Sequence, residues 1–436
     1  MPTNRTPLAL ISTIICFLML FSSAAYGEAT GIEGKTLTLS DCILIGMAEN
    51  PSAEISLQNL RAVQEKIGEA WGGYYPSIRL SSSYTFTGQQ EIMAIGPDAY
   101  DTRFFLRQTL FDAGATSNLV KSIRHSISSQ KYDVQRTAFD IVFNVKMAFY
   151  DVLKKRDLVE VAKAGFKDAE KHLEQSKELY KEGLMPRSDV IKTEVQVSNA
   201  RLEVIRADNA LLLARAALAT AMGQPVTTNF EVISNEKNTI SLLPPFQEAL
   251  TFAYDRRPEL RGTRAKIESA KANIDQVKSG FYPNISFDAS YGWQQGTFSP
   301  TDRKWSAGLT VGIPIFEQLT AKSKINQATA NLNSLKATEI QALRAVELEV
   351  KQAWLSLKES MERLDVTKKT QEQAEEDLRV SEGRYKEGIG NILEVLDAQT
   401  ALTQAKANNV IALYDIANSN ARLDRATGKD AAGGGI

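Results

Sequence analysis

Few side chains in this sequence have the type and spacing that chemistry requires. The two histidines, His125 and His172, lie far from each other and from any cysteine, whereas a metal site needs several such ligands close together. We expect both histidines to be solvated residues on a helix surface. The acids Glu375 and Glu376 fall on a polar helical face, which is typical of solubility and not of an acid–base pair. No phosphate-binding loop, H-E-x-x-H motif or nucleophile elbow occurs. The sequence therefore predicts neither an enzyme nor a bound cofactor or metal.

A second pair of acids could act on ions in transit. Glu394 and Asp397 stand three residues apart, so they share one face of a helix. If that face lines a narrow pore, the carboxylates attract cations and raise some of their own pKa values by mutual repulsion. Glu394 has an alternative role, because it follows Asn391 by three residues and could complete an N-terminal cap.

These acids belong to a chain that is internally duplicated. The tetrapeptide Tyr180, Lys181, Glu182 and Gly183 returns about 205 residues later as Tyr385, Lys386, Glu387 and Gly388. At nearly the same offset the match extends over residues 41–428, which indicates two copies of one unit. Each tetrapeptide closes a long heptad-patterned run, and its glycine can end a helix. Each copy therefore contains a helical hairpin with the tetrapeptide at its tip.

Composition restricts the partners and the compartment. Formal net charge is -1, from 51 basic and 52 acidic residues, so there is no electrostatic reason to expect nucleic-acid binding. Residues 1–27 have the layout of a secretory signal peptide, with an apolar run too short to span a membrane. A lipid anchor at Cys16 is disfavoured because the preceding Ile15 is bulky. We expect residues 28–436 to form one elongated unit whose tail, residues 429–436, is disordered.

Alternating polar and apolar residues predict four strands, two in each copy, at about residues 77–87, 101–111, 284–294 and 304–314. About ten residues suffice for a tilted strand to cross an outer membrane. Aromatic residues at the strand entrances would form an interfacial girdle: Tyr74, Tyr75, Phe281 and Tyr282. The alternative is a soluble sandwich with one wet face, but four strands are too few to bury these faces.

Helical periodicity covers most of the remaining chain, at about residues 41–72, 113–182, 187–222, 246–280, 317–387 and 391–427. Two of these helices are roughly 100 Å long and the others roughly half of that, at 1.5 Å per residue. We expect helix 187–222 to stack on helix 246–280, and helix 391–427 on helix 41–72, beside the two long helices. Segments 35–39 and 223–245 would then form a belt around the middle.

A seven-residue repeat marks the contact seams of the long helices. It runs through Val145, Val152 and Val159 in the first copy, and through Val350 and Leu357 in the second. Such a repeat predicts coiled-coil packing.

Four strands cannot stand alone in a membrane, because lipid offers no water to the unpaired edges of the sheet. Closure requires other copies of the chain. Two copies give eight strands and a filled interior, whereas three give twelve and leave a lumen. The sequence therefore predicts a mixed α and β membrane protein: a homotrimeric, 12-stranded β-barrel continuous with a long α-helical barrel.

The ordered, duplicated motifs resemble the TolC family of outer-membrane efflux proteins. The resemblance implies a trimeric duct in the outer membrane of a Gram-negative bacterium, with most of the chain in the periplasm. It also implies a periplasmic adaptor that docks at the tips, and an inner-membrane pump. Two functions follow from the sequence: a passive exit duct, or a non-conducting structural or adhesive protein anchored in outer-membrane lipid. Drugs, metal ions and polypeptides all stay open as cargo.

The same resemblance implies a periplasmic gate. The positions that match the family's closing contacts are Ser188 and Asp189 on the first hairpin and Tyr385 on the second, and acidic residues are expected at Glu394 and Asp397. Where the family leads us to expect a basic gate residue this chain has Gly390. Arg187 is the candidate that could replace it.

Overall fold

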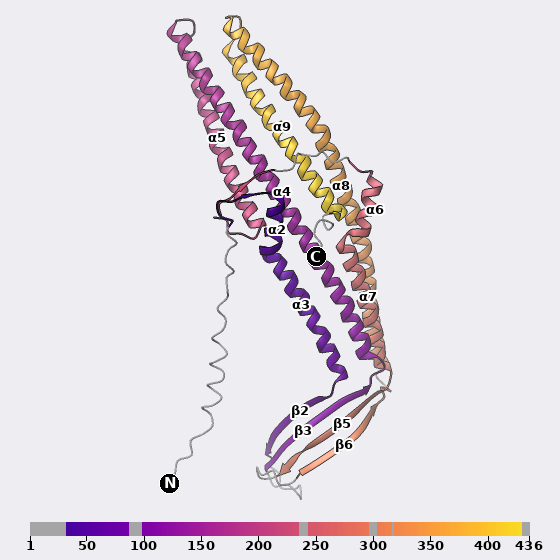
Figure 1. The fold of residues 1–436 in the computed structure, drawn as a ribbon. Coiled ribbons are helices and arrows are strands. Elements are labelled where there is room, and N and C mark those ends of the chain that lie inside the picture. The colour runs from indigo at the N-terminus through magenta and orange to yellow at the C-terminus, as the bar shows by residue number, and fades with distance from the viewer. Residues whose placement is uncertain (1–31, 87–97, 235–242, 296–302, 316–317, 430–436) are drawn as a thin grey trace, which may run out of the picture.

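The protein is an elongated body with a β-sheet at one end and two helical hairpins at the other (Figure 1). The computed structural model describes residues 32–86, 98–234, 243–295, 303–315 and 318–429. The signal peptide expected over 1–27, and the tail beyond Lys429, lie outside the described residues. In the described ranges, no helix has a stretch that is both long and apolar enough to span a membrane.

One antiparallel sheet joins the two copies of the duplication. Its strands are β2 (Ser77–Phe86), β3 (Asp98–Phe111), β5 (Asn284–Gln295) and β6 (Arg303–Gly312), in the order β2-β3-β5-β6. Strand β3 of the first copy pairs with β5 of the second, so that Phe104 lies opposite both Leu80 and Tyr291. Strands β2 and β6 are the two edges of the sheet.

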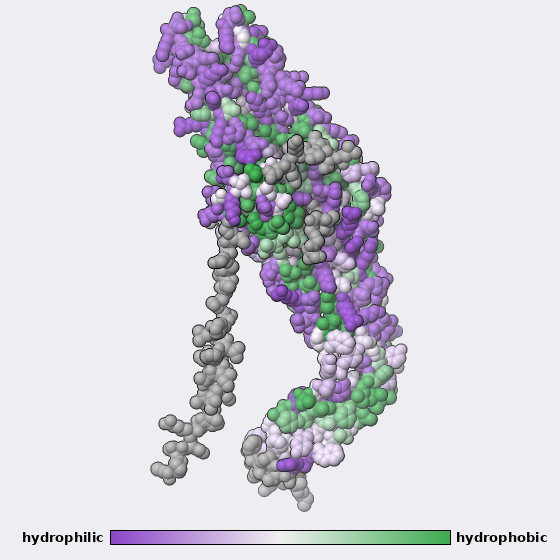
Figure 2. All heavy atoms as spheres, in the orientation of Figure 1, coloured by the Kyte–Doolittle hydropathy of each residue, from purple (hydrophilic) through white to green (hydrophobic). Residues whose placement is uncertain are grey.

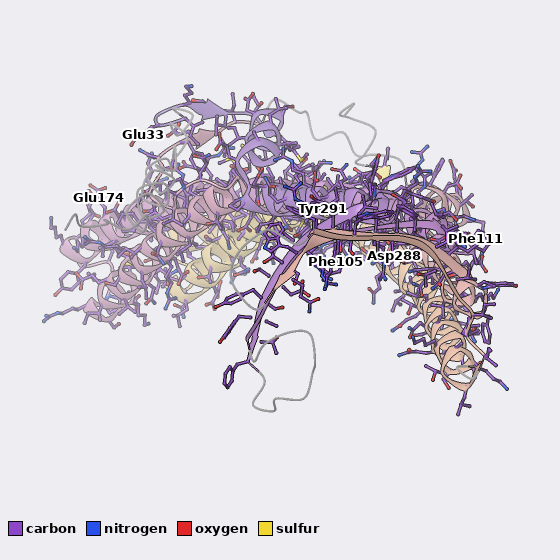
Figure 3. All side chains as sticks on the ribbon, turned by 90° about the horizontal axis from the view of Figure 1, so that it is seen from below. Glu33, Phe105, Phe111, Glu174, Asp288 and Tyr291 are labelled. Atoms are coloured by element: carbon purple, nitrogen blue, oxygen red, sulfur yellow. The ribbon has the colours of Figure 1, made fainter. Side chains whose placement is uncertain are left out.

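The register gives the sheet one polar and one apolar face, because residues directly opposite each other share a face. The sheet is curved like an arch, with Asp288 and Phe105 on its inner side and Tyr291 on its outer side (Figure 3). The concave face is therefore the polar one. Figure 2 shows hydrophobic residues gathered on the sheet and hydrophilic residues over the helical hairpins.

Two residues of β3 break the alternation. Gln108 lies on the apolar face, where its side-chain amide donates to the carbonyl of Tyr74 at 3.0 Å. A bulge after Thr109 then returns Phe111 to the apolar face, opposite Ile285. Phe105 is the reverse case, an aromatic residue on the polar face.

Four helices form the two hairpins: α4 (Ala115–Lys181), α5 (Arg187–Ala221), α8 (Gln318–Lys386) and α9 (Ile392–Thr427). The predicted seams are confirmed, since Val145, Val152, Val159, Val350 and Leu357 are all buried. Helix α4 packs on several sides, against α5, α9, α7 and α3.

The other helices are interrupted by proline. The prediction of a single helix over 41–72 is wrong, because this segment forms two helices, α2 (Leu39–Glu49) and α3 (Pro51–Trp71). The helix expected over 246–280 likewise consists of α6 (Phe246–Arg256) and α7 (Pro258–Lys278). Proline has no N–H and forces the residue before it out of the helical conformation. Accordingly, Asn50 and Arg257 have ψ angles of 122° and 120°.

These two breaks receive the ends of the shorter hairpin helices. The side-chain amide of Asn50 donates to the carbonyl of Ala221, at the end of α5, at 2.9 Å. The guanidinium of Arg257 donates to the carbonyl of Ala426, at the end of α9, at 3.2 Å. Helix α5 thus stacks on α2 and α3, and α9 on α6 and α7. The stacking expected from the sequence is wrong, because each helix end is capped by the proline break of its own copy.

Side by side, the helices form a curved layer. In the hairpin half the order is α5–α4–α9–α8, and in the half nearer the sheet it is α3–α4–α7–α8 (Figure 1). The outermost helices are therefore α5 and α8 above, and α3 and α8 below.

A belt crosses this layer near its middle. Strand β1 (Thr36–Leu37) pairs in parallel with β4 (Glu231–Val232). Of the segment expected over 223–245, residues 235–242 lie outside the described residues. Arg156 of α4 donates to the carbonyl of Val232 at 3.2 Å, which ties the belt to the long helix.

Candidate gate and docking surface at the helical tips

Both helical tips have the same backbone. Gly183 and Gly388 take φ angles of +74° and +73°, the left-handed conformation that glycine adopts without strain. The N–H groups of the following residues, Leu184 and Ile389, donate back to the last turns of α4 and α8 at 2.9 and 3.1 Å. This is the Schellman arrangement, which satisfies carbonyls left free at a helix end.

Each tip presents one aliphatic side chain to solvent. Leu184 is 70% exposed and Ile389 is 71% exposed. The charged tip residues are exposed as well: Lys181, Glu182, Lys386 and Glu387. Tyr180 is also exposed, whereas Tyr385 is partly buried. The two tips therefore match in backbone but differ in the role of their tyrosine.

Tyr385 connects the two hairpins. Its hydroxyl donates a hydrogen bond to Sδ of Met185, in the first hairpin, at 2.9 Å. Burial, together with the negative charge of Asp189, raises the pKa of Tyr385 above its usual value, so the hydroxyl keeps its proton at neutral pH. The family resemblance predicted a closing contact between Tyr385 and Ser188 or Asp189. In the described chain the acceptor of the Tyr385 hydroxyl is Met185 instead.

The carboxylate of Asp189 has other partners. It accepts from Lys192 Nζ at 3.1 Å and lies 3.3 Å from the hydroxyl of Ser188. Both neighbours lie on α5 and contact Oδ1, and no hydrogen bond from Tyr385 to Asp189 is found among the described residues. Asp189 therefore acts on Tyr385 through its charge.

Further polar contacts link the hairpins above the belt. Nε2 of His172 on α4 lies 3.5 Å from the carboxylate of Glu382 on α8, and His172 is only 7% exposed. The prediction that His172 is a solvated surface residue is therefore wrong, since the second hairpin covers the face of α4 that carries it. Gln399 of α9 also donates to Asp168 of α4 at 3.4 Å.

The two acids predicted for a pore lie on the exposed side of α9. Glu394 lies 3.6 Å from Nε of Arg384, across the tip on α8. The sequence offered Glu394 as the residue that completes the cap at Asn391. In the structure the Asn391 side chain instead caps the helix by accepting from the N–H of Leu393. Asp397 is exposed.

Arg384 is the basic residue of this tip that faces Glu394. A Cβ added to Gly390 would lie 3.0 Å from the Cβ of Arg384 and from the backbone of Tyr385, so this glycine makes room for the last turn of α8. Sequence reasoning named Arg187 as the candidate basic residue and missed Arg384, Met185 and Glu382. One signal was present: Arg384 immediately precedes the repeated tetrapeptide, where the first copy has Leu179.

At the other end, the aromatic residues predicted to form a girdle flank the junction between helices and sheet. They lie in or just after the short 3₁₀ turns Gly72–Tyr74 and Ser279–Phe281. All four are exposed, from 40% to 67%: Tyr74, Tyr75, Phe281 and Tyr282.

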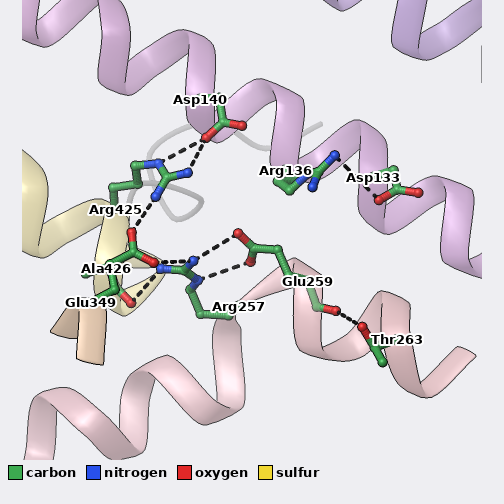
Figure 4. Close-up of polar contacts among 9 residues, drawn as sticks. All are labelled: Asp133, Arg136, Asp140, Arg257, Glu259, Thr263, Glu349, Arg425 and Ala426. Carbon is green, nitrogen blue, oxygen red and sulfur yellow. Dashed lines mark hydrogen bonds and ion pairs between the residues drawn. The ribbon is translucent and has the colours of Figure 1, made fainter. Parts of the chain in front are cut away.

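A cluster of charges lies near the middle, where α9 meets the break between α6 and α7 (Figure 4). Arg257 lies 2.8 Å from Glu349 and 3.0 Å from Glu259, and Arg425 lies 2.7 Å from Asp140. Burial alone lowers the pKa of Arg257, but its bonds to Glu349 and Glu259 outweigh this effect and raise the pKa. The cluster is a structural clamp between helices of both copies.

Across the described ranges, no three His, Cys, Asp or Glu side chains come together as a group that could hold a metal ion. The polar groups described above join helices, and none has the arrangement of a nucleophile with its base.

Comparisons with known proteins agree with this architecture. The sequence model of the family described as "Outer membrane efflux protein" matches residues 47–224 and 250–429. The outer membrane protein TolC of Escherichia coli is 23% identical over 398 residues, covering 87% of this chain and 80% of TolC. The solved structure of CusC has a TM-score of 0.80 at 15% identity, covering 93% of this chain and 95% of CusC. The outer membrane channel CmeC of Campylobacter jejuni has a TM-score of 0.77 at 14% identity, covering 89% of this chain and 85% of CmeC.

Proposed function

Because the chain belongs to the outer membrane efflux protein family, we propose that it is a passive exit duct for substrates delivered by an inner-membrane pump through a periplasmic adaptor. The protein resides in the outer membrane of a Gram-negative bacterium, with its large helical part in the periplasm. Members of this family are channels and not enzymes. The proposal covers three points: conduction by this chain, its assembly as a trimer, and its adaptor and pump partners.

The observation that carries the proposal is that, within the described residues, the protomer has open flanks in the sheet and in both halves of the helical layer. These flanks are strands β2 and β6 in the sheet, α3 and α8 below the belt, and α5 and α8 above it. The sheet and the helical layer both curve. A curved layer with open flanks at every level closes when further copies join flank to flank.

Exposed apolar side chains lie along the outer helices of the hairpins. Those on α5 recur every three to seven residues: Ile191, Val195, Leu202, Ile205 and Leu212. Those on α8 include Ile340, Leu348, Leu355, Val366 and Val380. Such stripes favour packing of α5 in one protomer against α8 in the next. Three copies bring together twelve strands, which leaves a lumen.

The sheet fits a membrane barrel. Its convex face carries exposed apolar residues such as Ile78, Trp305 and Leu309, which favours contact with lipid. Its polar concave face would then line the lumen. The aromatic residues at the strand entrances would lie at the membrane boundary on the periplasmic side.

The tips are the proposed adaptor surface. Three copies would present six similar tips, two from each chain, each with an exposed aliphatic residue after its glycine. An adaptor with helical ends could pack against Leu184 and Ile389. The contact between Tyr385 and Met185, with Ser188 and Asp189 nearby, is the proposed latch of the periplasmic gate. Glu394 and Asp397 would line its entrance.

Reconstitution in a planar bilayer tests the duct. We expect purified trimers to give step conductances that increase in variants of the Tyr385 latch. Absence of any conductance in wild type and latch variants alike would contradict the duct and favour the structural or adhesive function. Crosslinking from cysteines placed at Leu184 and Ile389, in cells, would identify the adaptor.

A further inference from the structure

The concave face of the sheet carries a basic band that no gate or docking role explains. The register places six charged residues on this face: the bases Arg79, Arg103, Arg107 and Lys304, and the acids Asp101 and Asp288. Four positive and two negative charges leave a formal charge of +2 on this face of each chain. Three copies would concentrate +6 on the inner wall of one barrel.

The acids neutralise two of the bases directly. Arg107 lies 2.6 Å from Asp288, and Arg103 lies 2.9 Å from Asp101 and donates to Gln294 at 2.9 Å. Gly292 lies directly opposite Arg103, where a Cβ would lie only 2.6 Å from Cα and 2.7 Å from Cγ of Arg103, so the close approach of the two strands requires glycine here. These two arginines are fixed to the wall.

Arg79 differs from them. It is exposed on β2, directly opposite Phe105 of β3. Among the described residues, no acidic side chain forms an ion pair with Arg79. Phe105 is 36% exposed and stands between Arg103 and Arg107 along β3. The register thus places Arg79 directly across from the aromatic residue Phe105 on an otherwise polar face, and Figure 3 shows Phe105 on the inner side of the sheet.

This pair suits one kind of solute. A guanidinium binds a carboxylate or sulfonate through two parallel hydrogen bonds. A phenyl ring beside it stacks against an apolar or aromatic group of the same solute. A positive lumen raises the local concentration of anions before they reach the pair.

We propose that Arg79 and Phe105 form a transit site in the barrel lumen for anionic aromatic solutes, within a basic band completed by Arg103, Arg107 and Lys304. The inference rests on the proposed duct, because only a conducting lumen brings solutes to this face. It assigns charge preference to the outer segment of the duct, separately from the acids at the periplasmic gate.

The test is block of single-channel current by a pyrene trisulfonate added on the barrel side. We expect concentration-dependent block in wild type that weakens with added salt. Arg79→Gln should raise the half-blocking concentration by roughly tenfold, the effect of losing one charged hydrogen bond. Arg79→Lys keeps the charge but loses the paired hydrogen bonds, so its half-blocking concentration should lie between those of wild type and Arg79→Gln.

A second probe isolates the ring. Phe105→Leu should weaken block by the aromatic sulfonate and leave block by an aliphatic tricarboxylate nearly unchanged. Arg303→Gln is the matched control, because Arg303 begins β6 on the opposite face, across from Trp293. The half-blocking concentration of Arg303→Gln should equal that of wild type.

The outcomes separate the two proposals. Unchanged block in Arg79→Gln, or equal weakening in Arg303→Gln, would overturn the transit site while the channel still conducts. A protein that never conducts would overturn the duct, and the transit site with it.

Discussion

The hydroxyl of Tyr385 on the second hairpin donates to Sδ of Met185 on the first, over 2.9 Å. A neutral hydrogen bond contributes only about 0.5–1.5 kcal/mol, but three symmetric copies would act together on one gate. A latch of this strength can be opened by a partner that binds the tips.

The first prediction concerns this latch. Tyr385→Phe removes the donor and should raise the open probability on the order of tenfold or more, since each copy loses about 1 kcal/mol. Met185→Leu removes the acceptor and should do the same. The control is Tyr180→Phe, which changes the equivalent exposed tyrosine of the other tip. Single-channel recording measures all three, and a closed-state lifetime equal to wild type in both latch variants would exclude the bond as a latch.

The second prediction concerns the acids near the tip. Three copies would provide six carboxylates from Glu394 and Asp397, and we expect them to cause block by multivalent cations. Because Glu394 lies 3.6 Å from Arg384, its charge is partly compensated, so Asp397→Ala should relieve more block than Glu394→Ala. Glu376→Ala, at an exposed acid paired with Arg379, is the control. Block that persists in the double variant would place both acids outside the pore.

The third prediction concerns adaptor docking. Gly388→Val forces a β-branched residue into a left-handed conformation, at a cost of about 1–3 kcal/mol, and should distort the tip. Export should fall more than trimer assembly does. Gly383 lies on the same helix with open space around it, so Gly383→Val should have little effect. Equal loss of trimer and export in Gly388→Val would point to a purely structural glycine.

The fourth prediction concerns the buried clamp. Arg257→Ala leaves Glu259 without its partner and Glu349 with Arg425 alone, and should destabilise the protein by roughly 1.5–3 kcal/mol. Asn50→Ala removes the equivalent cap in the first copy, which consists of two neutral bonds, to the Ala221 carbonyl and from the Ser52 N–H, worth about 1 kcal/mol each. Denaturant titration in detergent would measure both. Arg256→Ala, at the exposed neighbouring position, should change stability by less than about 0.5 kcal/mol, and a loss as large as that of Arg257→Ala would argue against the clamp.

The fifth prediction concerns Cys42. Burial, with a smaller effect of Asp41, raises the pKa of its thiol to about 12. Because a raised pKa favours the neutral thiol, almost no reactive thiolate exists in the folded protein at pH 8. Iodoacetamide should therefore label Cys42 only on unfolding. Labelling of the native protein at the rate of the unfolded chain would contradict the burial.

The duplication, the four strands, the two hairpin tips and the contact seams could all be predicted from the amino-acid sequence. These features are local or periodic: alternation gives a strand with two faces, a heptad gives a seam, and a repeated Tyr-Lys-Glu-Gly gives a repeated turn. The family resemblance had the same source, because it rested on the order of these motifs.

Contacts between segments far apart in the chain could not be predicted in this way. The stacking of α5 on α2 and α3 depends on which proline break caps which helix end, and helix length says nothing about that. The burial of His172 and the bond from Tyr385 to Met185 both depend on the approach of two hairpins about 200 residues apart in sequence. Such contacts are set by how packed surfaces fit together, and no periodicity along the chain records them.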